Sequence, residues 1–349
     1  FRRFTRTRHA LAVNSGTPGL HLSLLACGVG AGDRVLTTPF SFVASTNALL
    51  YERAVPVFVD VDPVTGNMDA EQTAQAAADL QSGGAAAQRW LPRQGDEAPG
   101  ALKSLLAVDV FGQPADYDAL RGISTRHSLS LIEDSCEALG AEYKGRPAGT
   151  LGDCGVFAFY PNKQITTGEG GLVITDDERM STLMQALRNQ GRAPGDTWLE
   201  HTYLGYNYRL DELSAALGAA QMARIEELLT SRQQTADWYA ERLAEIPGVE
   251  APVLIPSTTR VSWFVYVIRL ARGADRAALA ERLGARGVPV RPYFSPIHLQ
   301  PYMVERFGYR RGDFPVTEDL GERGLALPFS GKMSEEQVDT VCRTLASCL

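Results

Sequence analysis

Short apolar runs alternate with helix-length amphipathic segments along the first half of the chain. Several runs are apolar on consecutive positions, which is typical of strands that are covered on both faces. This alternation predicts an α/β fold with a mostly parallel central sheet flanked by helices. The expected strands lie at 9–13, 34–38, 55–61, 104–112, 129–134, 155–160 and 171–175, and the expected helices between them lie at 17–29, 41–53, 69–80 and 115–127.

The pattern changes in the second half of the chain. It is mainly helical from 177 to about 246, and the stretch 245–252, which contains Pro and Gly, marks a boundary. We therefore expect a large domain over 1–248 and a small α+β domain over 249–349. The small domain is predicted from apolar runs at 262–270 and 287–294, a helix near 274–286 and a final helix that begins near Ser334. Residues 81–100 are rich in Gly, Pro and Ala without periodicity, which predicts an exposed loop.

Composition limits the class of protein. With 349 residues, of which 44% are hydrophobic and 21% are charged, the chain is long enough for one large and one smaller domain. Its apolar runs fall well short of the roughly 20 residues of a membrane helix, and the basic N-terminus lacks the apolar segment of a signal peptide. We therefore expect a soluble, cytoplasmic protein without a membrane partner.

Cysteine usage and charge exclude further classes. The five cysteines are widely spread and form no CxxC pair, which argues against a disulfide framework and against a zinc site, so no metal is expected. A formal net charge of −7 with mixed signs disfavours nucleic-acid binding. It is compatible with a local cationic pocket for a small anion.

Polar residues that follow apolar strands are the first candidates for chemistry, because ligands of open parallel sheets bind beyond the carboxyl ends of the strands. The strand at 9–13 is followed by Ser15, Gly16 and Thr17, where a helix begins. Thr17 suits the N-cap position, and Pro18 suits the first helical turn. Free N–H groups and the helix dipole would make this a phosphate site, although a plain helix cap explains the same residues.

Two further strands lead into ionisable residues. The strand at 129–134 ends in Glu133 and Asp134, which either cap the next helix or, beside a bound heteroaromatic nitrogen, hold that nitrogen protonated. Lys163 follows one strand later, before the glycine-rich stretch 168–171. It is either a surface residue in a turn or a partly desolvated amine that forms a Schiff base with an aldehyde. An anion site, an acid and an amine are the three groups that pyridoxal 5′-phosphate needs.

Eight motifs occur in the order of one known family. They are NSGT, TTPFSFVASTNA, VFVDVDP, VFGQPADYDAL, IEDSCEALGAEYKGRPAGTLGD, FYPNKQITTGEGGLVITDD, LGYNYRLDELSAALG and PIHLQPYM. With them the chain resembles the DegT/DnrJ/StrS family of pyridoxal-phosphate-dependent sugar aminotransferases of fold type I, and within it the perosamine-synthase-like branch. The resemblance extends from about Val13 to the C-terminus. It implies a homodimer with shared active sites.

The resemblance implies a role for each matching residue around the cofactor. Lys163 is expected to be the Schiff-base lysine and the proton shuttle, and Asp134 is expected to pair with the pyridine nitrogen. Glu137 matches a position near the cofactor hydroxyl. The other residues implied to bind the cofactor are Ser15, Gly16 and Thr17 at the phosphate, Phe42 on the ring with Phe40 as the weaker candidate, and Asn207 and Arg209, which would reach the partner's phosphate.

The resemblance also implies substrate contacts. His298 matches a family histidine at the substrate mouth, and Arg291 and Tyr293 are expected to contact the substrate as well. The two substrates that the resemblance implies, L-glutamate and a nucleotide-linked sugar, are both anionic. An arginine should therefore pair with the carboxylate or the diphosphate, and the candidates are Arg209, Arg291 and Arg192.

The reaction implied by the resemblance is amino transfer from L-glutamate to a nucleotide-linked keto sugar, as in deoxyamino-sugar and polysaccharide biosynthesis. Glu137 favours a 4-keto-6-deoxyhexose, since 3-aminotransferases of the family more often have Gln or His there. A 3-keto sugar or a cyclitol or aminoshikimate-type ring is the alternative substrate, and a non-catalytic sensor with this fold is a third interpretation.

One residue departs from the family pattern. At the position of Ala158, many relatives have a serine that touches the phosphate.

Overall fold

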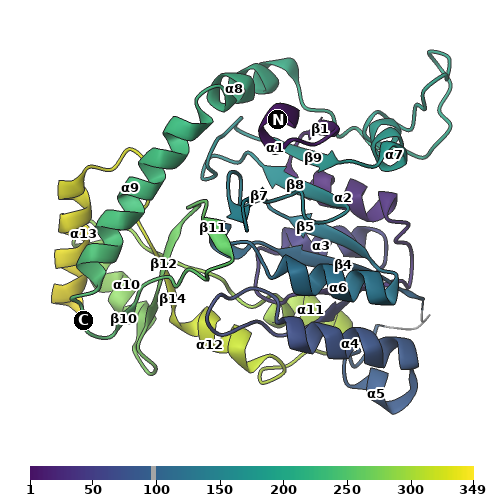
Figure 1. Cartoon of the computed structure of the whole chain (residues 1–349). Coiled ribbons are helices and arrows are strands. Elements are labelled where there is room, and N and C mark those ends of the chain that lie inside the picture. Colours follow the sequence, from purple (N-terminus) through teal and green to yellow (C-terminus); the bar gives the residue numbers. More distant parts are fainter. Residues whose placement is uncertain (96–99) are drawn as a thin grey trace.

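The large sheet of the protein is mostly parallel, as predicted (Figure 1). The computed structural model describes residues 1–95 and 100–349, and within them seven strands form this sheet in the order β1-β9-β8-β5-β4-β2-β3. β9 runs antiparallel to both of its neighbours, and the other adjacent pairs are parallel. The strands are β1 (His9–Val13), β2 (Arg34–Thr37), β3 (Val55–Phe58), β4 (Leu102–Val108), β5 (Ser130–Asp134), β8 (Cys154–Ala158) and β9 (Gly171–Thr175).

Helices cover both faces of this sheet, and consecutive strand residues divide between them. Leu106 and Ile132 pack in the hydrophobic cluster of one face, whereas Leu105 and Leu131 pack in the cluster of the other face. Because side chains alternate along a strand, burial on both faces requires apolar residues at successive positions. The first face is covered by α2 (Gly16–Ala26), α3 (Ala44–Tyr51) and α7 (Glu178–Arg188), and the second by α4 (Ala70–Ser82) and α6 (Tyr117–His127).

The C-terminal part forms a second unit around a four-stranded antiparallel sheet, in the order β10-β12-β14-β13. Its core includes Tyr239 and Leu243 of the long helix α9 (Ile225–Leu243), so this core draws on the chain before the expected boundary at 248, which stays a prediction. The elements of this unit are β10 (Val249–Glu250), β12 (Tyr266–Leu270), α10 (Arg276–Ala285), β13 (Arg291–Pro292), β14 (Gly324–Leu327) and α13 (Glu335–Cys348).

Two helices connect the two units, and several short elements complete the fold. In Figure 1, α8 and α9 run from the region of β1 to the C-terminal unit. α11 packs in one hydrophobic cluster with β3, and α12 contacts β12 of the C-terminal unit. The remaining elements are α1 (Arg2–Thr5), α5 (Gly84–Gln88), η1 (Val110–Gly112), β6 (Glu142–Tyr143), β7 (Arg146–Pro147), α8 (Glu212–Met222), β11 (Thr258–Arg260), η2 (Ile297–Leu299), α11 (Pro301–Phe307) and α12 (Pro315–Arg323). None of the helices in the described residues has the length and apolar character of a membrane span.

Two local predictions were wrong. The N-cap of α2 is Ser15, whose backbone is extended, and not Thr17, because the helical conformation already begins at Gly16. The stretch 81–100 is not a loop throughout, because α4 continues to Ser82 and α5 follows. After α5, the indole N–H of Trp90 donates a hydrogen bond to Asp79 of α4 over 2.8 Å, which holds this stretch against the fold. The part of the predicted loop at 96–99 lies outside the described residues.

Candidate active site

A cavity of about 460 Å³ lies beyond the carboxyl ends of β4, β5 and β8. Ser15, Gly16 and Thr17 at the start of α2 form one end of its lining, and Lys163 lies on the loop between β8 and β9. Phe264, Tyr293 and Phe294 of the C-terminal unit complete the wall. The structure therefore places residues from four distant parts of the sequence around one space, at the edge of the sheet where ligands of α/β folds bind.

The N-terminus of α2 is open toward this cavity. Ser15 occupies the N-cap, but its side chain makes no capping hydrogen bond, so the N–H groups of the first turn are left for another acceptor. A Cβ atom on Gly16 would lie 2.9 Å from both the Cβ of Ala158 and the Sγ of Cys136, which explains the glycine. The helix dipole adds positive potential, and this end of the cavity can bind an anion.

The two acids at the end of β5 have different environments because they point to opposite faces of the sheet. Glu133 is fully buried, and its carboxylate accepts hydrogen bonds from the backbone N–H groups of Gly149, Leu151 and Gly152. It holds the 149–152 turn. Asp134 lines the cavity instead, so the strand alternation selects it as the acid of the site.

Asp134 is fixed by contacts that the sequence did not indicate. The hydroxyl of Ser45 donates to its Oδ2 over 2.6 Å, and the backbone N–H of Cys136 donates to its Oδ1 over 3.2 Å. Ser41 lies 2.8 Å from Ser45 and extends this chain of hydroxyls. The sequence alone shows only that two serines, four residues apart, lie near the start of α3. Their contact with an acid 89 positions away comes from the fold.

Lys163 is mostly buried, with 13% of its side chain exposed. Its Nζ lies 3.6 Å from the Oε1 of Glu137 and 3.9 Å from the ring centroid of Phe264. Burial raises the pKa of Glu137 above its usual range, and the adjacent Lys163 opposes this shift. The lysine amine therefore lies between a carboxylate and an aromatic face.

The backbone of Lys163 is held by α9. One Nη of Arg232 donates to the carbonyl of Lys163 over 2.9 Å, and the other donates to the carbonyl of Trp263 over 3.1 Å. The guanidinium is largely desolvated, which lowers the pKa of Arg232 to about 10. Arg232 therefore joins the lysine loop to the segment that carries Phe264. Neither Arg232 nor Phe264 was predicted from the sequence.

The two phenylalanines predicted to contact the cofactor ring differ in exposure. Phe42 lines the cavity with 61% of its surface exposed, whereas Phe40 is 2% exposed and packs edge-on against Phe111 and Phe294 in the core. Phe42 is thus the ring that a bound ligand can reach. Tyr293 also lines the cavity, and burial raises the pKa of its hydroxyl.

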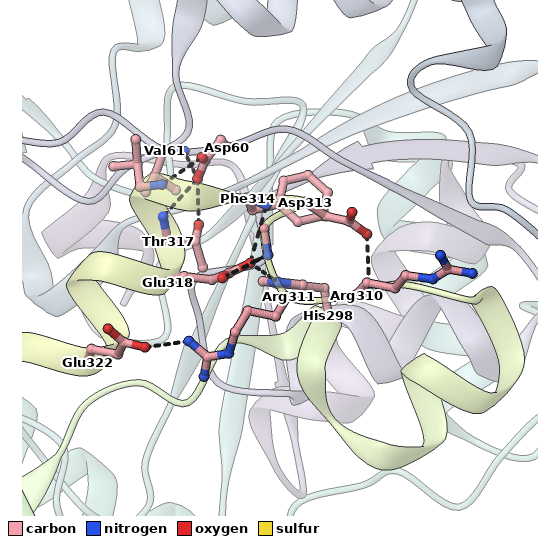
Figure 2. A network of polar contacts seen from close by, with 12 residues as sticks. Asp60, Val61, His298, Arg310, Arg311, Asp313, Phe314, Thr317, Glu318 and Glu322 are labelled. Atoms are coloured by element: carbon pink, nitrogen blue, oxygen red, sulfur yellow. Dashed lines mark hydrogen bonds and ion pairs between the residues drawn. The ribbon is translucent and has the colours of Figure 1, made fainter.

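His298 lies outside the cavity, contrary to the expectation that it contacts substrate. Its ring is fully buried, its Nε2 lies 3.0 Å from the Oε1 of Glu318, and Phe314 packs edge-on against it. Figure 2 shows this pair within a polar network in which Asp60 also accepts hydrogen bonds from Thr317. The network joins the segment after β3 to the start of α12, so the position of His298 indicates a structural role.

We expect His298→Ala to lower the free energy of unfolding by about 3 kcal/mol, because it leaves a cavity and removes the buried partner of Glu318. Burial lowers the pKa of His298, so the folded protein favours the neutral ring more than the unfolded chain does. Its contribution is therefore present above the unfolded pKa of about 6.5 and is lost as pH falls below that value. Urea unfolding at pH 7.5 and 5.5 should show a smaller pH effect in the variant. A large rise in KM with unchanged stability would instead support the substrate role.

The candidate arginines also lie apart from the cavity. The guanidinium of Arg192 lies over the Trp198 ring at 4.6 Å, and Arg209 donates to the Oδ1 of Asn189 over 2.8 Å. Arg291 is exposed and donates to the carbonyl of Val290. Within the described residues, the cavity lining contains no arginine.

Asn207 and Arg209 do not line the cavity of their own chain. The 205–209 segment runs beside the end of β1, where the N–H of Asn14 donates to the carbonyl of Tyr208 over 3.0 Å. Arg209 forms an isolated β-bridge with Val13. Both Asn207 and Arg209 are exposed. They are therefore available on the surface beside the open end of α2.

Comparison with known proteins gives consistent results. Residues 1–346 match the model of the DegT/DnrJ/EryC1/StrS aminotransferase family. The chain is 34% identical over 351 residues to GDP-perosamine synthase of Caulobacter vibrioides, covering 100% of this chain and 88% of that protein. Its fold is similar to that of S. venezuelae DesV, with a TM-score of 0.86, 30% identity and coverage of 99% and 86% of the two chains. Its fold is also similar to that of 3-amino-5-hydroxybenzoic acid synthase, with a TM-score of 0.86, 28% identity and coverage of 100% of this chain and 88% of that chain.

Proposed function

Because this chain belongs to the DegT/DnrJ/EryC1/StrS aminotransferase family, we propose that it transfers an amino group from L-glutamate to a nucleotide-linked keto sugar, with pyridoxal 5′-phosphate in the cavity. The observation that carries this proposal is that Lys163, Asp134 and the open N-terminus of α2 line one cavity. These groups match the aldehyde, the pyridine nitrogen and the phosphate of that cofactor.

The residues around the cavity fit this cofactor. Backbone N–H groups of the first turn of α2, at Gly16 and Thr17, would bind the phosphate, and Asp134 would keep the pyridine nitrogen protonated. The exposed ring of Phe42 would cover one ring face. Ala158 lines the cavity but brings no hydroxyl, so the helix N-terminus carries more of the phosphate binding here. When bound, the cofactor supplies an electron sink for the carbon that loses its proton.

Lys163 is the residue that takes and returns that proton in this proposal. A general base must be neutral to accept a proton and must release it again, so its surroundings have to tolerate both forms. Glu137 at 3.6 Å and the face of Phe264 at 3.9 Å are the neighbours of the amine that would carry this proton. The aromatic wall of Phe264, Tyr293 and Phe294 limits the access of water to this amine.

We also propose that the enzyme is a homodimer with shared sites. Both substrates are anionic, yet the described lining contains no arginine to pair with them or with the cofactor phosphate. Asn207 and Arg209 are exposed near the site without entering it, which suits residues that complete the cavity of a second copy. The same region exposes large apolar side chains, as protein interfaces do, namely Trp198, Leu199, Leu204 and Leu213.

The favoured acceptor is a nucleoside-diphosphate 4-keto-6-deoxyhexose. Glu137 beside Lys163 and the similarity to a GDP-perosamine synthase both support this choice. The second candidate is a 3-keto sugar or an unlinked ring ketone of the cyclitol or aminoshikimate type. It is supported by the fold similarity to 3-amino-5-hydroxybenzoic acid synthase over the whole chain.

Incubation with L-glutamate and matched 4-keto and 3-keto nucleotide sugars, together with an unlinked cyclitol ketone, tests the proposal. We expect 2-oxoglutarate to form and NMR to locate the new C–N bond at C4 of the sugar. Lys163→Ala serves as the control without the amine. Amination only at C3 or only of the unlinked ring would establish the second candidate, and failure with every ketone and with glutamate alone would favour a non-catalytic role.

A further inference from the structure

A closed set of contacts ties the 205–209 segment to the helices of the first sheet face. His21 on α2 is 2% exposed, and its Nε2 lies 2.7 Å from the Oε1 of Glu52, the C-cap residue that follows α3. Its Nδ1 lies 3.1 Å from the hydroxyl of Tyr208. The hydroxyl of Tyr206 donates to the same Oε1 of Glu52 over 3.2 Å. We refer to these four residues, His21, Glu52, Tyr206 and Tyr208, as the His21 cluster.

The contacts of the His21 cluster are compatible with one another. The two ring nitrogens of His21 bond to Glu52 and to the hydroxyl of Tyr208, and the hydroxyl of Tyr206 also donates to Glu52. The rings support the same geometry, since Tyr206 and Tyr208 stack with centroids 4.8 Å apart and an interplanar angle of 8°. His21 meets Tyr206 edge-on at 4.9 Å. Buried polar networks that are fully satisfied make the groups that they join rigid.

The 205–209 segment is extended, so its side chains alternate between two sides. Tyr206 and Tyr208 point to α2 and are half-buried, whereas Asn207 and Arg209 are exposed. Backbone hydrogen bonds connect the segment to the last two residues of α7, from the N–H of Tyr206 to the carbonyl of Leu187 and from the N–H of Tyr208 to the carbonyl of Arg188. Fixing the two tyrosines therefore fixes the direction in which Asn207 and Arg209 point.

We propose that the His21 cluster is a positioning device for the site of the second copy. It holds Asn207 and Arg209 in the orientation in which they complete the neighbouring cavity, so a change on α2 of one chain lowers catalysis at the lysine of the other chain. This inference rests on the shared-site homodimer proposed above. None of the four residues lines the cavity of its own chain, so they act through Asn207 and Arg209 and not on the substrate directly.

Mixed dimers separate this role from an effect on the same chain. The double variant Tyr206→Phe/Tyr208→Phe keeps the stacked rings but removes both hydroxyls, and we expect it to form 2-oxoglutarate from L-glutamate about tenfold more slowly. Refolding it together with Lys163→Ala should raise the rate severalfold above that of the two variants mixed without refolding. In the mixed dimer, the chain with the intact lysine receives an unaltered 205–209 segment from its partner. No rise, or no loss in the double variant itself, would overturn the inference.

A reference mixture distinguishes failure of the inference from failure of the homodimer proposal. Asn207→Ala refolded with Lys163→Ala should regain activity if sites are shared. If this mixture recovers and the tyrosine mixture does not, only the His21 cluster inference fails. If neither recovers, shared sites and the inference fail together.

Hydrogen exchange provides a measurement that does not depend on turnover. In the double variant, the amides of Tyr206 and Tyr208 should exchange at least about tenfold faster, while the amides of α2 keep their protection. Glu52→Gln retains the acceptor oxygen and should resemble the unaltered protein, whereas Glu52→Leu should resemble the double variant. Tyr51→Phe is the matched control, because the Tyr51 ring meets His21 edge-on but its hydroxyl makes no hydrogen bond within the described residues. Unchanged exchange in the double variant would contradict the inference.

Discussion

Lys163→Ala is expected to lower turnover by at least about 10⁴-fold, because it removes the amine that would bind the cofactor covalently and would move the proton. The fold should be retained, since the lysine makes one ion pair and one ring contact at the edge of a cavity. Steady-state kinetics with L-glutamate measures the loss. Borohydride reduction of the unaltered enzyme followed by peptide mapping should place the pyridoxyl label on Lys163.

Two control variants test whether the loss of turnover is specific to the amine of Lys163. Lys163→Arg retains the positive charge beside Glu137 but is always protonated, so it should be as inactive as the alanine variant. Lys332→Ala removes a lysine from a surface loop and should leave turnover unchanged. A pyridoxyl label on another lysine, or substantial turnover by the arginine variant, would contradict the assignment. Without Lys163, the pKa of Glu137 should rise further, since the lysine now opposes the effect of burial.

Asp134→Asn is expected to reduce turnover by about 10²- to 10³-fold, because the neutral amide cannot hold a pyridine nitrogen in its protonated form. The hydroxyl of Ser45 can still donate to the amide oxygen over the shorter of the two bonds, and the longer bond from the N–H of Cys136 is lost, so most of the local structure should persist. The dissociation constant for pyridoxal 5′-phosphate should also rise. Kinetics and equilibrium dialysis measure the two effects separately.

Asp109→Asn is the matched control for this change. Asp109 is a fully buried acid on the adjacent strand end, and burial raises its pKa to about 7, but it bonds to Tyr117 and Ser135 and does not line the cavity. Its replacement should affect stability more than cofactor affinity. Equal effects of the two variants on cofactor binding would argue that Asp134 acts only through the fold.

The sequence predicted the parts of the site that depend on strand ends. Lys163, Asp134 and the start of α2 each follow an apolar strand, and such ends meet at one edge of a parallel sheet, so their convergence could be expected. The structure adds the direction of each side chain at these strand ends. It shows that Asp134 and not Glu133 lines the cavity, and that Phe42 and not Phe40 does so. The roles of these residues stay predictions until the experiments above are done.

Contacts between distant segments could not be predicted from the sequence. Ser45 binds Asp134 across 89 positions, and Phe264 reaches Lys163 from the other unit of the protein. No local pattern encodes such pairs, because they depend on how the units pack. The position of His298 was equally hidden from the sequence, and its role at the substrate stays a prediction. Its motif gave a position in the chain, but its burial beside Glu318 depends on α12, which lies about 20 residues further along.

Arg232 has a consequence for how substrate range can change in this enzyme. Its guanidinium bonds to the carbonyls of Lys163 and Trp263, so a backbone shift at 263–264 would displace the lysine as well. Phe42 and Tyr293 line the same cavity, and within the described residues neither of them makes a hydrogen bond to the backbone of Lys163. Adaptation to a bulkier sugar should therefore proceed through substitutions at those two positions, while the 263–264 backbone is retained. Directed evolution toward new acceptors is expected to follow this division.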